Sequence, residues 1–249
     1  MENNEKRERD EERFDGETRV KSSFSEKVEN FWYHYKWHTI AAIFVLVVSI
    51  VVIVQCASRE KYDVYILYAG DKAVSTSKSN PERQQFVGAF SSVASDFDGN
   101  GDVSVAFKHL YQPDDEEIER LRELEKTGEG EVPESLIYQD GKTLDSLLIQ
   151  SEYYLLLLDK AVFDRCCARG VISAAESFLP DGFDGEIVKG ENGGSGIWLR
   201  DTGFYALEGV CTLPDDVVIC VKLAGAMASD DDLELREDAI AVFRAIAMT

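Results

Sequence analysis

An uncharged apolar run near the N-terminus constrains this chain more than any other feature of its sequence. Residues 40–54 carry no charge, and the stretch from Trp37 to Ala57 is long enough to cross a bilayer core, which needs about 20 residues. Five of the seven residues in 31–37 are aromatic, and aromatic rings concentrate where a membrane meets water. The sequence therefore predicts an aromatic belt and a single transmembrane helix over residues 31–57.

Two processing signals are alternatives to a permanent anchor. About 39 residues, many of them acidic, precede the apolar run, whereas a cleaved signal peptide begins with a short basic region. Cys56 follows the run as a lipidated cysteine would, but Gln55 stands where that motif has a small residue. We expect a retained span, and lipidation of Cys56 stays an open alternative.

The acidic charge lies almost entirely after the apolar run. Residues 60–249 contain 37 acidic and 17 basic side chains, a net charge of −20. A surface of this charge repels a phosphate backbone, so nucleic acid is excluded as an expected partner. Four basic residues flank the run on its N-terminal side and three on its C-terminal side, which favours a cytoplasmic N-terminus. We therefore expect a disordered, charged cytoplasmic tail over residues 1–30 and an extracytoplasmic domain over residues 58–249 of a cell-membrane protein.

Strand and helix patterns alternate through the first part of this domain. Short apolar or β-branched runs predict strands over residues 62–69, 103–111 and 153–158. Apolar residues at helical spacing predict helices over residues 81–97, 114–126, 142–150 and 159–168, and Asp159 is placed to cap the last of these. The later part predicts antiparallel strands over 197–199, 204–213 and 217–223, and a closing helix over 235–246. The fold class is therefore α/β: an N-terminal transmembrane helix followed by one mixed-sheet domain.

Residues 143–179 contain a helix-then-strand segment followed by a helix and a loop. This segment resembles part of the extracellular solute-binding proteins. The resemblance covers under a fifth of the chain, and any α/β domain contains segments of this kind. It implies a ligand at the carboxyl ends of the strands. The residues at those ends are Gly70, Asp71, Asp159 and Lys160.

Residues 96–107 resemble the calcium-binding loop of EF-hand proteins. Oxygen-bearing side chains stand at spacings typical of that loop, and Gly101 stands at its sixth position. The last position should be a glutamate, and here it is Phe107. The resemblance implies weak calcium binding, and a helix end followed by a polar turn into a strand is the alternative. The candidate metal ligands are Asp96, Asp98, Asn100, Asp102 and Ser104.

A predicted hairpin brings two cysteines opposite each other. If the strands over 204–213 and 217–223 turn at Asp215 and Asp216, then Cys211 and Cys220 face one another. Outside the cytoplasm such a pair can be oxidised to a disulfide. Adjacent Cys166 and Cys167 fit packed helix positions better than a redox pair, because no CxxC motif is present.

Motifs for catalysis are not visible in the sequence. No GxSxG, HExxH or paired-carboxylate pattern is present, and His109 is the one histidine after the apolar run. This favours binding over catalysis without excluding an enzyme, and no cofactor is expected apart from the calcium alternative. The single span with its aromatic belt also resembles single-pass bacterial envelope proteins. We expect an anchored extracytoplasmic module that binds a small ligand or a protein partner, or alternatively a structural or accessory subunit of an envelope complex.

Overall fold

The computed structural model describes residues 24–57, 61–75, 77–149 and 152–249. The chain divides into two compact units, residues 1–60 and residues 61–249, and each is described by itself. Most of the expected cytoplasmic tail, residues 1–23, and Glu60 lie outside the described residues. Residues 150 and 151 also lie outside the described residues, so the last residue of the helix predicted over 142–150 is among them.

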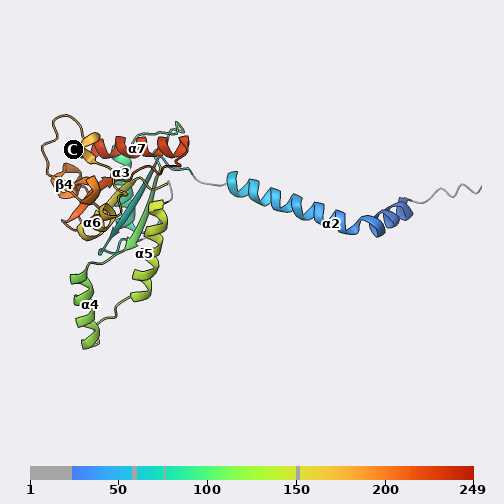
Figure 1. Cartoon of the computed structure of the whole chain (residues 1–249), viewed down its shortest axis with the longest axis horizontal. Coiled ribbons are helices and arrows are strands. Elements are labelled where there is room, and N and C mark those ends of the chain that lie inside the picture. The colour runs from blue at the N-terminus through green and yellow to red at the C-terminus, as the bar shows by residue number, and fades with distance from the viewer. Residues whose placement is uncertain (1–23, 58–60, 76, 150–151) are drawn as a thin grey trace, which may run out of the picture. The chain divides into compact units, whose positions relative to one another are not determined.

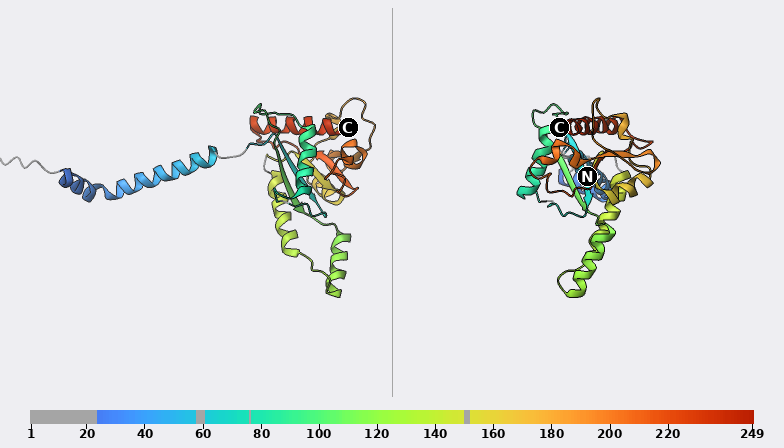
Figure 2. Two further views of the ribbon diagram at one scale, coloured as in Figure 1. Left: turned by 180° about the vertical axis from the view of Figure 1, so that it is seen from behind. Right: turned by 90° about the vertical axis from the view of Figure 1, so that its left-hand side faces the viewer.

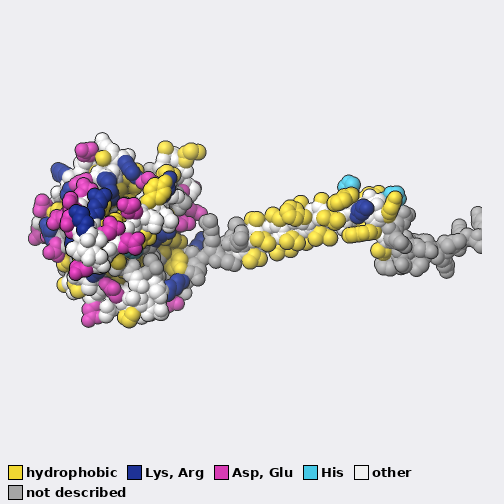
Figure 3. All heavy atoms as spheres, turned by 90° about the horizontal axis from the view of Figure 1, so that it is seen from below, with side chains coloured by type: hydrophobic (Ala, Val, Ile, Leu, Met, Phe, Trp, Pro, Cys, Tyr) yellow, Lys and Arg dark blue, Asp and Glu magenta, His cyan; other side chains and the backbone are white. Residues whose placement is uncertain are grey.

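Helix α2 (Phe24–Ala57) contains the apolar run and begins within the expected tail. Its segment Phe31–Val54 has a mean hydropathy of 2.7, and none of its most apolar window is buried inside the protein. Apolar side chains cover most of the coloured part of this helix in Figure 3. By length and composition this helix can cross a membrane, and both an anchor and a signal sequence have these properties.

One mixed sheet of six strands forms the centre of the second unit, in the order β2-β1-β3-β6-β5-β4. Strand β1 lies parallel to both β2 and β3, while β6, β5 and β4 continue the sheet through antiparallel pairs. This confirms the prediction of an α/β domain with a mixed sheet. The strands are β1 (Val64–Gly70), β2 (Val105–Tyr111), β3 (Leu155–Asp159), β4 (Ile187–Lys189), β5 (Ser195–Trp198) and β6 (Val217–Val221).

Helices cover both faces of the sheet (Figures 1 and 2). Helices α3 (Pro81–Val93) and α7 (Asp230–Ala247) pack in one apolar cluster with alternate residues of the central strands. Helices α5 (Glu134–Ile149) and α6 (Lys160–Ala168) pack in the other cluster against the opposite face. Helix α4 (Asp115–Thr127) buries no side chain and extends with the first half of α5 beyond the body of the domain (Figure 1).

Strand β3 has the central place that its composition predicts. All five of its residues are buried, as expected for an apolar strand covered on both faces. The chain passes from β1 to β2 on one side, and the next connection runs from β2 past β1 to β3 on the other side. The strand order therefore reverses between β1 and β3, and in open α/β sheets ligands bind at the carboxyl ends of the strands near such a point.

The predicted hairpin before β6 is wrong. Residues 204–213 form a short 3-10 helix (Gly203–Ala206) and turns, and β6 pairs with β3 and β5 instead. Phe204, Val210 and Leu213 are buried without belonging to a strand, so their apolar character reflects packing and not strand pairing. Gly209 has a φ of 84°, which an extended strand cannot contain. Further 3-10 turns span Ala175–Ser177, Glu191–Gly193 and Leu199–Asp201.

Candidate functional site

The four ligand-binding residues predicted from the sequence meet at the carboxyl ends of β1 and β3. The backbone N–H of Asp71 donates a hydrogen bond of 2.7 Å to Oδ2 of Asp159. A Cβ on Gly70 would lie 2.1 Å from the same oxygen, so only glycine leaves room for the carboxyl group there. Lys160 follows directly as the first residue of α6, with its ammonium group paired to Asp164. The structure brings these residues together, and whether they bind a ligand stays a prediction.

Asp159 stands at the N-cap position of α6, as predicted, but its side chain does not cap the helix. Its side chain makes no capping hydrogen bond and turns to the neighbouring strand end, where it accepts from Asp71. Only 6% of Asp159 is exposed, and this burial raises the pKa of its carboxyl group to about 7. The hydrogen bond from Asp71 opposes that rise, while the negative charges of Asp71 and Asp216 add to it.

Tyr68 lies next to this carboxyl group and His109 lies next to Tyr68, and the sequence analysis did not select either residue for this site. Tyr68 is fully buried on β1, and its ring stacks on His109 of β2 with 5.3 Å between ring centroids. Burial also lowers the pKa of His109. Among the described residues, Tyr68 Oη, His109 Nε2 and Asp159 Oδ1 are buried without a hydrogen-bond partner. The polar cluster at the strand ends is therefore larger than the predicted one.

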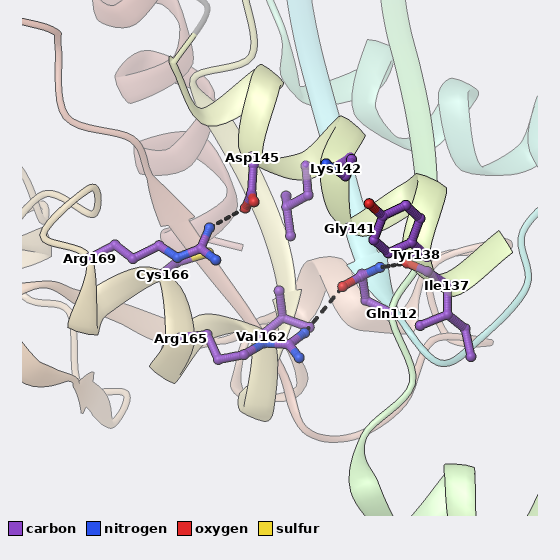
Figure 4. Close-up of a pocket in the computed structure, with 11 residues that line it drawn as sticks. Gln112, Ile137, Tyr138, Gly141, Lys142, Asp145, Val162, Arg165, Cys166 and Arg169 are labelled. Atoms are coloured by element: carbon purple, nitrogen blue, oxygen red, sulfur yellow. Dashed lines mark hydrogen bonds and ion pairs between the residues drawn. The ribbon is translucent and has the colours of Figure 1, made fainter. Parts of the chain in front are cut away.

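A pocket of about 330 Å³ lies between α5 and α6, beside the carboxyl end of β2 (Figure 4). It is on the sheet face that α5 and α6 cover, where Gln112 follows the last residue of β2. None of the predicted ligand residues lines it. The lining residues are Gln112, Ile137, Tyr138, Gly141, Lys142, Leu144, Asp145, Val162, Arg165, Cys166 and Arg169.

Gln112 is the buried polar residue of the pocket, with 7% of its surface exposed. Its Nε2 donates to the carbonyl oxygens of Tyr111 at 2.9 Å and Ile137 at 3.2 Å. These two bonds fix which end of the amide is the oxygen. Its Oε1 then accepts a hydrogen bond of 3.3 Å from Nη2 of Arg165, as the dashed lines in Figure 4 show. The buried amide thus orients an arginine at the pocket.

Positive charge prevails in this pocket, although the domain as a whole is strongly acidic. Lys142, Arg165 and Arg169 line it together with one carboxylate, that of Asp145. Arg169 forms an ion pair with Asp145, and the Lys142 ammonium lies 5.1 Å from the ring centroid of Tyr138. Within the part of the chain that the structure describes, Arg165 forms no ion pair. A signal for this site existed in the sequence as two arginines four residues apart, Arg165 on α6 and Arg169 at its C-terminal end, but only the fold shows what they face.

The predicted calcium loop is closed by its own hydrogen bonds. Carboxylate oxygens of Asp96 and Asp98 accept from the backbone N–H groups of Asn100 and Gly101, and Asn100 Oδ1 accepts from Asp102. Ser104 does not join these residues, because its N–H and hydroxyl both donate to Asp63. The loop therefore has the internal bonding of a polar turn into β2, which was the alternative to calcium.

Asp63 is the acidic residue at this loop that the sequence analysis missed. One carboxylate oxygen each of Asp63, Asp96 and Asp98 lies within 4.8 Å of the others, a spacing that a metal ion could bridge. Both oxygens of Asp63 already accept two hydrogen bonds each, from Phe97, Asp98 and Ser104. Burial alone would raise the pKa of Asp63, but these bonds outweigh it and lower the pKa. Calcium binding here stays a prediction.

The predicted disulfide is not formed. Cys211 is an exposed free thiol in the turns before β6, whereas Cys220 is a buried free thiol within β6 and pairs across the sheet with Leu156. The correction follows from the missing hairpin, because no strand presents Cys211 to Cys220. Burial raises the pKa of Cys166 to about 12 and that of Cys167 to about 11, so neither thiol is set up as a nucleophile.

Comparisons of the chain with protein-family models, with curated proteins and with solved structures found no match.

Proposed function

We propose that this protein is a membrane-anchored binding module that holds a small ligand in the pocket between α5 and α6. Its apolar helix would be retained as a single span, with the N-terminus in the cytoplasm and the globular domain outside. The length and hydropathy of α2 support the span, and the distribution of basic residues on its two sides supports the orientation.

The observation that carries the binding function is the fixed pair of Gln112 and Arg165. A buried amide held by two backbone carbonyls directs a guanidinium group at a pocket of about 330 Å³. Small-ligand sites typically combine a volume of this order with apolar walls and a few oriented polar groups. The pocket also lies at carboxyl strand ends, where α/β sheets commonly bind ligands, because the backbone N–H of Gln112 donates to the carbonyl oxygen of Gly70 at the end of β1.

Gly141 offers a matched pair of variants to test this function. A Cβ at this position would lie 3.7 Å from the side chain of Gln112, which is ordinary contact. Gly141→Ala should therefore leave the pocket open and favour α5 by about 1 kcal/mol. Gly141→Leu places three more carbon atoms in the space beside Gln112 and should obstruct it. The comparison separates loss of the pocket from loss of the glycine.

The measurement is ligand-observed NMR on the full chain in nanodiscs, with empty nanodiscs as the blank. Each of the four probes contains a benzene ring with a different polar group: benzoate, phenyl phosphate, benzylamine and benzyl alcohol. We expect at least one probe to bind the native protein and Gly141→Ala, and to lose its binding in Gly141→Leu. Binding of no probe, or binding that Gly141→Leu leaves unchanged, would contradict a ligand site in this pocket.

A second function, docking of another envelope protein, is favoured by the projecting helix α4. Ile118, Leu121 and Leu124 lie on one side of α4 and are only half-buried, and no residue of this helix is buried. In Figure 2 the helix again extends away from the sheet. Another protein could cover these apolar side chains on the projecting helix, as expected for an accessory subunit of a complex. None of the three lines the pocket, so mutations can separate the two functions.

A further inference from the structure

We infer that the ligand of the α5–α6 pocket is a small organic anion, whose carboxylate or phosphate group binds Arg165 and Lys142. This inference rests on the proposed function and adds the chemical class of the ligand. It follows from three properties of the pocket: its charge relative to the rest of the domain, the donors left on Arg165, and its apolar wall.

The charge of the pocket is opposite to that of the domain around it. Residues 60–249 have a net charge of −20, while the pocket lining has three basic side chains and one acidic one. Asp145 would oppose an anion, but it is already paired with Arg169. Basic groups that gather at one cavity of an acidic surface make a local attraction for anions, and low-dielectric walls strengthen it.

Arg165 keeps most of its hydrogen-bonding capacity. A guanidinium group has five N–H donors in a planar fork, and among the described residues Arg165 uses one of them, for Gln112. That fork matches the two oxygens of a carboxylate or phosphate. In Figure 4 Arg165 and Lys142 come from α6 and α5, on opposite sides of the pocket. An anion between them would bind charges from both helices.

The remaining wall sets the organic part of the ligand. Ile137, Leu144 and Val162 contribute aliphatic surface, and Tyr138 adds an exposed ring. An inorganic ion would leave this surface in contact with water. A pocket of about 330 Å³ lies at the small end of ligand sites, which span roughly 300–1,000 Å³. An anion with a short apolar or aromatic body would place its charge at the basic side chains and its body against the apolar wall.

The four probes used for Gly141 also test the charge of the ligand, because they differ only in the group on the ring. We expect benzoate or phenyl phosphate to bind and benzylamine not to bind. Arg165→Gln should weaken anion binding by about tenfold or more, the usual effect of losing a charged hydrogen-bond partner. Lys142→Gln, at an exposed side chain, should weaken it less. Arg122→Gln on α4 removes the same charge outside the pocket and should change nothing.

The possible outcomes distinguish failure of the anion inference from failure of the proposed function. Anion binding that is lost in both Gly141→Leu and Arg165→Gln supports the two together, and the relative affinities of benzoate and phenyl phosphate show which anionic group is preferred. Binding of benzylamine or benzyl alcohol that depends on Gly141, without anion binding, overturns the anion and keeps the pocket. If Arg165→Gln and Lys142→Gln change the affinity for the anion no more than Arg122→Gln does, the proposed contacts of the anion with Arg165 and Lys142 are overturned. Insensitivity of all binding to Gly141→Leu overturns the proposed function itself.

Discussion

Replacing Asp159 with asparagine should make the domain more stable above neutral pH. In the folded protein this carboxyl group has a pKa of about 7, against an ordinary value of 3.8. A folded-state pKa that is raised means that the folded state holds the proton more tightly than the unfolded state. The contribution of this proton to the free energy of unfolding is therefore fully present below pH 3.8 and is lost as the pH rises through 7.

The size of the effect follows from the two pKa values. Ionising the buried carboxyl group at high pH costs about 4 kcal/mol relative to the unfolded chain, with 1.4 kcal/mol for each tenfold change in proton affinity. Between pH 5 and pH 8 the free energy of unfolding should fall by about 2.5 kcal/mol from this group alone. Asp159→Asn should abolish that fall, because the amide has nearly the same shape and no charge. Its oxygen can still accept the hydrogen bond from Asp71.

Urea unfolding of the full chain in detergent micelles, followed by circular dichroism at pH 5, 6, 7 and 8, measures this difference. Asp181→Asn removes one exposed carboxylate and is the control for net charge. Comparing variants is necessary because burial also raises the pKa of Asp238, to about 6, which adds a slope of the same sign. If the native and Asp159→Asn stabilities stay parallel from pH 5 to pH 8, the buried carboxyl group does not titrate near neutrality and the reasoning is refuted.

Two other predictions test the loop before β2 and the orientation of the domain. Asp63→Asn should lower the free energy of unfolding by about 3 kcal/mol, because it removes one carboxylate oxygen that accepts two charge-assisted hydrogen bonds. Asp98→Asn, at an exposed position, should lower it by less than about 1 kcal/mol. Equal urea midpoints for the two variants would contradict this prediction. A membrane-impermeant maleimide should label Cys211 on intact cells expressing a Cys56→Ser chain, and Cys211→Ser should remove the signal. Labelling that requires permeabilised cells would place the domain in the cytoplasm.

Local patterns in the sequence were sufficient for the central elements of this fold. Strands β1, β2 and β3 and helices α3, α4, α6 and α7 appear within a few residues of where alternation, apolar runs and breakers predict them. These signals work because strand burial and helix amphipathicity repeat along the chain itself. Gly70 and Asp159 could be brought together from the same information, since the carboxyl ends of parallel strands meet at one edge of a sheet.

The errors arose where residues far apart in the sequence determine the conformation. Phe204, Val210 and Leu213 have the composition of a strand, but they fill a gap against other elements without pairing. Helix α5 begins eight residues before its prediction, at Glu134, and the added turns include Asp140, which accepts a hydrogen bond from the backbone N–H of Tyr111 at the end of β2. Asp63 and Ser104 are 41 residues apart, and no local pattern connects them.

By itself, the sequence determined the apolar span, the acidic character of the domain, the α/β class and the polar residues at the ends of β1 and β3. These follow from composition and periodicity, which act on neighbouring residues. The tertiary structure alone decided the α5–α6 pocket, the partner of Asp159 and the separation of Cys211 from Cys220. Gln112 and Arg165 are 53 residues apart and meet only because α6 packs on the sheet face beside the end of β2. The free energy that holds them there belongs to the packing of the whole domain and not to either segment.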